Sequence, residues 1–352
     1  MTQIFIFIAF VVAGYGAGAI TGINPIDLAF FEPFAGAALV IGLYGSVVGI
    51  DLTAIQKRRR LAIVVITIAV PLQILATGAL MWLIYPLAIS WLIAVAMTQI
   101  DPLSVDTLLR DKDNMSEESK GILRVWASFD DPVTVLFGFL ILLPLVTGEA
   151  TDFDVISTSL YVVYNLLPAA LIYGLQRYTK LLDNTVIATI LLIVVLVFAF
   201  FVQGYLLAAI VGLLLRPLPE ELFSRAIFVL YHLIVFTVGM ALATFGTEIQ
   251  EGIRLGFIIA TIEFFVIQPL TTLIVFNGTP SDLLRISYAQ QNGLTTLLMG
   301  IAFEALGIHI LHILLPAIII VNLMNLAVNR LYTWKEKQGL IEYETPAPVS
   351  SE

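Results

Sequence analysis

The sequence contains no cysteine and little charge, since only 12% of its 352 residues are Asp, Glu, Lys or Arg. The absence of cysteine excludes disulfide bonds and thiolate metal sites. The scarcity of charge, together with 59% hydrophobic residues and a mean hydropathy of +0.99, excludes an ordinary soluble domain, which is about half apolar and a quarter charged. We therefore expect an integral membrane protein whose main partner is the lipid bilayer. Nothing in the composition predicts a cofactor.

Apolar runs of about 20 residues, the length that crosses a bilayer as a helix, recur along the whole chain. They predict one all-α polytopic domain over residues 1–335 with about twelve transmembrane helices. A short disordered cytoplasmic tail is expected over 336–352. The expected helices cover 4–21, 31–50, 61–85, 88–109, 121–147, 154–176, 185–202, 204–216, 223–247, 252–276, 285–307 and 309–332, with the least certain boundary at Gln203 and Gly204.

The basic residues predict the orientation, because Lys and Arg concentrate in cytoplasmic loops. With an even number of helices, only Arg254 of the 17 basic residues falls on the side opposite to the others. Both termini are then cytoplasmic, and we expect the protein in the inner membrane of a prokaryotic cell. The basic run 57–60 fits an anchor on the inner side better than a patch for nucleic acid, which is not an expected partner.

Three carboxylates lie within otherwise apolar stretches. Asp101 follows Thr98 in ThrGlnIleAspPro, and Asp130 and Asp131 follow Ser128 in SerPheAspAspPro. An ionised carboxylate at membrane depth is costly unless it is solvated or paired, so these acids indicate an ion or proton site. A proline disfavours helix at the residue before it, which predicts that the fourth helix is broken at Asp101. The adjacent pair lies about 100° apart on its helix, so only one of the two acids can point straight into a given cavity.

A second polar interruption lies in the eleventh expected helix, at Gln290, Gln291, Asn292, Gly293, Thr295 and Thr296. It comes seven helices after the first, as an inverted repeat would place it. Broken helices at matching positions of two halves indicate the binding site of a transporter. The alternative is that small polar residues simply hold neighbouring helices together.

These residues carry a resemblance to a known family. Five short motifs occur in a characteristic order along the chain. They are a glycine-rich segment in the first helix, ValGlyIleAspLeu at 48–52, AspPro in the fourth helix, the AspAsp pair in the fifth and the glycine-containing break in the eleventh. The glycines of the first of these motifs are Gly14, Gly16 and Gly18. Over essentially its whole length the chain resembles the monovalent cation/proton antiporter superfamily. The resemblance implies the sodium/proton antiporter fold, with a dimerisation domain, a core domain with two crossed unwound helices, elevator-like movement of the core, and a homodimer.

The resemblance also implies roles for the acids. Asp131 matches the acid that binds cation and proton in turn, Asp130 matches the first acid of the pair, and Asp101 matches the acid beside the break. Expected cation ligands are hard oxygens: the carboxylates of Asp131 and Asp101, the hydroxyl of Ser128 or Thr98, freed carbonyls and water. Na⁺ is the expected cargo, with Li⁺ and K⁺ as alternatives, exchanged for protons in the service of pH homeostasis.

One departure concerns the tenth helix. The family commonly places a basic residue just before a proline, where it pairs with the first acid of the fifth helix. Here that position holds Gln268, and the same helix carries Glu263 five residues earlier. We expect both to support the site, as we expect of Asn292 and Gly293. With no basic partner, Asp130 is either protonated or compensated by a bound cation.

Other functions were weighed against an antiporter. A membrane protease would carry its two acids on separate helices in TyrAsp and GlyXGlyAsp contexts, which do not occur, so we expect no enzyme. A sodium-coupled symporter of related fold would need an anion-binding Lys or Arg at that depth, and none lies there. A sensory or channel-like component built on an antiporter scaffold stays open, because the usual basic residue is missing.

Overall fold

The computed structural model describes residues 2–48, 59–100, 105, 116–147, 155–276 and 279–338, and every regular element in these residues is a helix. The elements are α1 (Thr2–Thr21), η1 (Pro25–Asp27), α2 (Phe31–Val48), α4 (Arg59–Val64), η2 (Val65–Ala69), α5 (Val70–Ile84), α6 (Ile89–Met97), α8 (Glu117–Leu136), η3 (Phe137–Leu142), α9 (Leu143–Thr147), α10 (Val155–Tyr178), η5 (Leu181–Asp183), α11 (Thr185–Phe201), α12 (Tyr205–Leu214), α13 (Glu220–Leu242), α14 (Glu248–Ile262), η6 (Glu263–Ile267), α15 (Gln268–Val275), α16 (Pro280–Ser287), α17 (Leu294–Ala305) and α18 (Leu311–Lys337).

These bounds follow the helices predicted from the sequence to within a few residues at most ends. Seven of the described helical stretches are long and apolar enough to cross a bilayer, and the chain is an integral membrane protein. The count of twelve transmembrane helices and the inverted repeat stay predictions. The predicted turn at Gln203 and Gly204 is confirmed, since Gln203 has φ of 51° and separates α11 from α12.

Two predicted helices differ from the structure. Within the helix predicted over 88–109, α6 ends at Met97, Thr98 forms a turn, and Gln99 and Ile100 are not helical. The helix predicted over 285–307 is divided into α16 and α17 by a non-helical stretch, which is the predicted second break. α18 continues through Lys337, two residues into the predicted tail, and residues 339–352 lie outside the described part of the chain.

Three long helices contain a wider, π-helical turn just before a proline. η2 precedes Pro71, η3 precedes Pro144 and η6 precedes Pro269. A proline has no N–H, and its ring crowds the carbonyl four residues earlier, so a wider turn keeps the helix continuous past it. Turns of this kind are frequent at functional sites. In η6 the first position is Glu263.

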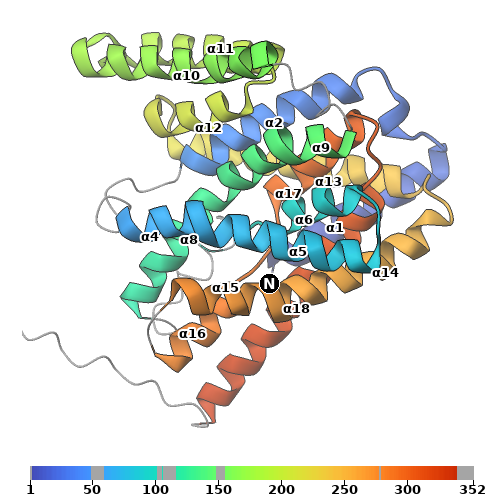
Figure 1. Ribbon diagram of the computed structural model, residues 1–352. Coiled ribbons are helices and arrows are strands. Elements are labelled where there is room, and N and C mark those ends of the chain that lie inside the picture. Colours follow the sequence, from blue (N-terminus) through green and yellow to red (C-terminus); the bar gives the residue numbers. More distant parts are fainter. Residues whose placement is uncertain are drawn as a thin grey trace, which may run out of the picture.

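The two interrupted helices lie in the interior. α17 is buried from Leu294 through Glu304, and α6 is buried from Leu92 through Met97. Figure 1 shows α10 and α11 at one edge of the molecule, where both contact α12, and α16 and α18 toward the opposite edge. Large apolar side chains such as Leu171 and Phe201 are exposed on the edge helices, as expected of a surface that faces lipid. The polar residues of the breaks are thus shielded from lipid by the surrounding helices.

Candidate functional site

The two helix breaks lie against each other and share hydrogen bonds. The side-chain amide of Asn292 donates to the carbonyls of Met97 at 2.9 Å and Gln99 at 3.1 Å. Gln290 donates to the same Met97 carbonyl at 3.0 Å. The last carbonyls of a helix have no partner within it, and here the carbonyls at the end of α6 receive amide donors from the second break. The two predicted breaks therefore lie in contact, and Asn292 joins them.

α18 fixes the backbone of the second break. The amide of Asn322 donates to the Asn292 carbonyl at 2.8 Å, and its oxygen accepts from the Asn292 N–H at 3.2 Å. Asn325 donates to the Tyr288 carbonyl at 2.8 Å and accepts a hydrogen bond from Gln291. Exposed backbone groups at membrane depth must be satisfied within the protein. The amide side chains of α18 meet that need for Asn292 and Tyr288.

Each acid of the adjacent pair on α8 binds a different break. Asp130 Oδ2 accepts a hydrogen bond of 2.8 Å from the N–H of Ile100, beyond the end of α6. Asp131 Oδ2 accepts one of 2.6 Å from the hydroxyl of Thr295, in the first turn of α17. Asp130 is fully buried and Asp131 is 1% exposed. The angle between neighbouring positions of a helix thus directs one carboxylate to each break.

Gln99 links the three elements through a hydrogen-bond network. Its side-chain nitrogen donates to the Thr134 hydroxyl at 2.8 Å, one turn beyond the acid pair on α8. Its oxygen accepts from the hydroxyl of Thr296 at 3.4 Å. Thr134 in turn donates to the carbonyls of Asp130 and Asp131, both at 2.9 Å. Sequence reasoning missed Gln99 and Thr134 as parts of the site, although each is a polar residue among apolar neighbours.

The hydroxyls of the predicted ligands Thr98 and Ser128 are bonded to backbone carbonyls. Thr98 is fully buried, and its hydroxyl donates to the Val95 carbonyl at 3.3 Å. The hydroxyl of Ser128 donates at 2.6 Å to the Arg124 carbonyl, one turn earlier on α8. Asp101 lies outside the described residues. Within the described part of the chain, no group of three or more His, Cys, Asp and Glu residues is arranged to hold a metal ion.

The tenth-helix residues Gln268 and Glu263 contact α5. The amide of Gln73 donates to the side-chain oxygen of Gln268 at 2.7 Å, and the hydroxyl of Thr77, one turn further on, donates to Glu263 Oε1. All four side chains are fully buried. Gln268 stands at the position where the resembled family commonly has a base, and its hydrogen bond is with the Gln73 amide on α5. Gln73 and Thr77 are two further residues that sequence reasoning missed.

The charges at this centre are all acidic among the described side chains. Asp131 and Glu263 both lie close enough to Asp130 for their charges to repel its own. The buried Lys and Arg side chains with described surroundings are Lys120 and Arg285. Lys120 lies in the first turn of α8, ten residues before Asp130, which is about 15 Å along a helix axis. Among the described side chains, the charges that act on Asp130 are therefore all negative.

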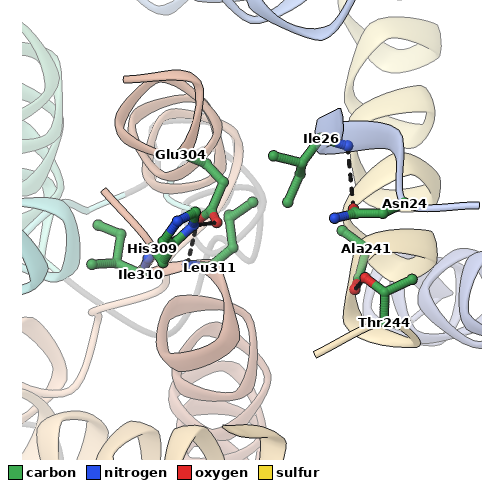
Figure 2. Close-up of polar contacts among 8 residues, drawn as sticks. All are labelled: Asn24, Ile26, Ala241, Thr244, Glu304, His309, Ile310 and Leu311. Carbon is green, nitrogen blue, oxygen red and sulfur yellow. Dashed lines mark hydrogen bonds and ion pairs between the residues drawn. The ribbon is translucent and has the colours of Figure 1, made fainter. Parts of the chain in front are cut away.

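A second polar cluster lies where α17 leads into α18. Glu304 Oε1 is 2.7 Å from His309 Nδ1, and Glu304 Oε2 accepts the N–H groups of Ile310 and Leu311 at 3.1 Å each (Figure 2). A carboxylate at the start of a helix accepts hydrogen bonds from N–H groups that have no partner within the helix, and its negative charge interacts favourably with the positive end of the helix dipole. A cavity of about 260 Å³ beside it is lined by Asn24, Ile26, Asp27, Thr244, Phe245, Glu248, Glu304 and His309. This cluster stabilises a connection that is predicted to be extracytoplasmic.

Comparison with known proteins supports the fold. No protein-family model and no curated protein sequence matches the chain. Among solved structures, the sodium proton antiporter MjNhaP1 from Methanocaldococcus jannaschii, solved at pH 8, matches with a TM-score of 0.65 at 13% sequence identity. The match covers 90% of this chain and 91% of that one. The chain therefore shares the fold of this sodium proton antiporter, which is a transporter, as the resemblance implied.

Proposed function

We propose that the protein is a secondary active transporter that exchanges a monovalent cation for protons. The observation that carries the proposal is that the two adjacent acids of α8 bind different helix breaks: Asp130 accepts a hydrogen bond from the first break and Asp131 accepts one from the second. Two buried carboxylates at crossed, unwound helices form a site for a small cation near the middle of the bundle. Na⁺ is the proposed cargo, with Li⁺ and K⁺ as alternatives.

Asp131 is the proposed carrier of both cation and proton. Its carboxylate is costly to bury while ionised, so it is stable in the membrane when a proton or a cation neutralises it. The two compete for the same oxygens, and this competition couples their movement in opposite directions. Oxygen ligands suit a hard monovalent cation. The proposed set is Asp131, Asp101, the hydroxyls of Thr98 and Ser128, and the carbonyl oxygens at the breaks.

We propose that transport proceeds by elevator-like movement of a rigid core within a homodimer. Hydrogen bonds join the end of α6, the acids of α8, the start of α17 and the amides of α18 into one unit. A unit so connected is suited to move as one body. The proposed location is the inner membrane of a prokaryotic cell, with both termini in the cytoplasm and a role in pH homeostasis.

Reconstituted protein provides the test. Vesicles that contain a pH dye are challenged in turn with Na⁺, Li⁺ and K⁺ between about pH 6 and 9, the range in which a tuned acid exchanges protons with water. We expect cation-dependent proton movement, and we expect Asp131→Asn to reduce it to the level of empty vesicles while the protein stays folded. Asp101→Asn should weaken the apparent cation affinity more than the maximal rate. No proton movement with any of the three cations would refute the proposal.

A further inference from the structure

Glu263 is a fully buried acid with an incomplete set of hydrogen bonds. It is the first residue of η6, and its Oε1 accepts from Thr77. Its Oε2 has no hydrogen-bond partner among the described residues. The other buried glutamate, Glu304, differs in this respect, because both of its oxygens are bonded. Buried polar atoms without a partner are uncommon in folded proteins and call for an explanation.

The side chain of Gln290 lies beside Glu263 and also retains an oxygen without a donor. The Gln290 nitrogen is engaged with the Met97 carbonyl at 3.0 Å. A carboxylate can only accept hydrogen bonds, whereas a carboxylic acid also donates one. A proton on Glu263 therefore gives this carboxyl group a donor that its ionised form lacks.

Among the described residues, no charged group supplies a positive charge beside Glu263. On α14, which leads into η6, Arg254 lies nine residues earlier, about 13 Å along a helix axis. α5 and α6 contain no titratable residue, and α8 contributes Asp130, whose charge interacts with that of Glu263. The Tyr288 ring lies 5.3 Å from that of the neighbouring Phe264. α18 carries His312 in its first turn and the neutral Asn322 and Asn325 in its middle. Its other charged and titratable residues lie toward its far end: Arg330, Tyr332, Lys335, Glu336 and Lys337. Among the described residues nothing balances the negative charge of Glu263, so a proton or a cation bound nearby is the expected compensation.

We propose that Glu263 is a second proton-binding acid of the transport site and that it releases its proton when a cation binds at Asp131. The inference rests on the proposed exchange function and specifies its stoichiometry. A cation that enters the centre adds one positive charge, which stabilises a nearby carboxylate. Binding of one cation then displaces one proton from Asp131 and one from Glu263. Each transport cycle moves one net positive charge in the direction of the protons.

The test counts protons released per cation bound, using purified protein in weakly buffered detergent solution with Na⁺ alone as the probe. A pH dye reports the protons, and calorimetry reports the cations. We expect about two protons per Na⁺ for the parent and about one for Glu263→Gln, as two independent acids require. Glu304→Gln is the matched control, because it alters a buried glutamate away from the centre and should leave the count at about two.

The outcomes separate this inference from the function on which it rests. A parent protein that binds Na⁺ and releases no proton refutes the exchange function itself. A parent that releases the same number as Glu263→Gln retains the exchange function and overturns the role of Glu263. If Glu263→Gln does not fold, Thr77→Val replaces it. Loss of the Thr77 hydroxyl removes a donor to the carboxylate, so the second proton should leave only at higher pH, and an unchanged pH profile overturns the proposal.

Discussion

The side-chain amide of Gln73 donates a hydrogen bond of 2.7 Å to the side-chain oxygen of Gln268, and this bond joins α5 to α15 beyond the π-helical turn that precedes each helix. At the position where the resembled family commonly has a base, this chain thus has a neutral amide bonded to a second amide. Gln268 keeps a side-chain nitrogen, and Gln73 a side-chain oxygen, without a partner among the described residues. The pair connects the third and tenth helices without contributing charge.

Gln268→Lys should change the charge moved per transport cycle. The ammonium can donate to the unsatisfied Gln73 oxygen, and its positive charge neutralises one nearby carboxylate without a proton or a cation. We expect a change of about one elementary charge per cycle, measured as transport current in vesicles held at different potentials. Asp130→Asn and Glu263→Gln backgrounds identify the acid that is neutralised. An unchanged current in every background would show that position 268 is not coupled to the acids.

Thr295→Val should move the pH optimum of exchange to higher pH. The Thr295 hydroxyl donates to Asp131 Oδ2 at 2.6 Å, which stabilises the ionised carboxylate, so its loss favours the protonated acid. A hydrogen bond to a charged group contributes about 1.5–3 kcal/mol, which corresponds to about one to two pH units. Thr295→Ser keeps the hydroxyl and should retain the parental optimum. The same profile in Thr295→Val as in Thr295→Ser would argue against a role for this bond.

Asp130→Leu should destabilise the protein, whereas Asp130→Asn should be tolerated. Asp130 accepts the N–H of Ile100 at the first break, and an asparagine oxygen can accept it as well. Leucine leaves that buried donor without a partner, at a cost of about 1–3 kcal/mol. Thermal unfolding in detergent measures the difference. Equal stability of the two variants would mean that the bond does not hold the break.

Gly14→Ala should loosen the packing of α1 on α13. A Cβ at Gly14 would lie 2.2 Å from the backbone oxygen of Phe236, so the two helices would have to separate. Overpacking of this kind costs about 1–3 kcal/mol. Gly16→Ala is the control on the same helix, since a Cβ there meets nothing within 4 Å. We expect a lower melting temperature for the first variant only, and equal melting temperatures would contradict the close approach.

The helices, the break in the eleventh helix and the position of the acid pair were predictable from the sequence, because apolar runs and polar interruptions are local features. The partners of these residues were not. In the sequence, Asn322 and Asn325 are indistinguishable from other polar residues of a membrane helix. Only the fold brings their amides to the carbonyls of Asn292 and Tyr288. The family resemblance predicted Gln268 near Asp130, but its hydrogen bond is with Gln73. The two glutamines are 195 positions apart in the sequence, so no local pattern predicts their contact.

The prediction for the first break was partly correct. The proline after Asp101 pointed to the right helix, but regular geometry already ends at Thr98. The cause is tertiary: the carbonyls of Met97 and Gln99 receive donors from Asn292, and the Ile100 N–H is taken by Asp130. No local pattern predicts a helix end that is determined by side chains from two other helices.

The bonds of Glu304 and Asn322 tie α17 to α18 at both ends of the shorter helix. At one end Glu304 holds the first N–H groups of α18, and at the other Asn322 holds the backbone of Asn292 just before α17 begins. The two helices therefore form a closed ring of covalent and hydrogen bonds. Such a ring resists sliding of one helix along the other. A displacement at the His309 end would therefore move α17 and α18 together. The first turn of α17, where Thr295 donates to Asp131, would move with them.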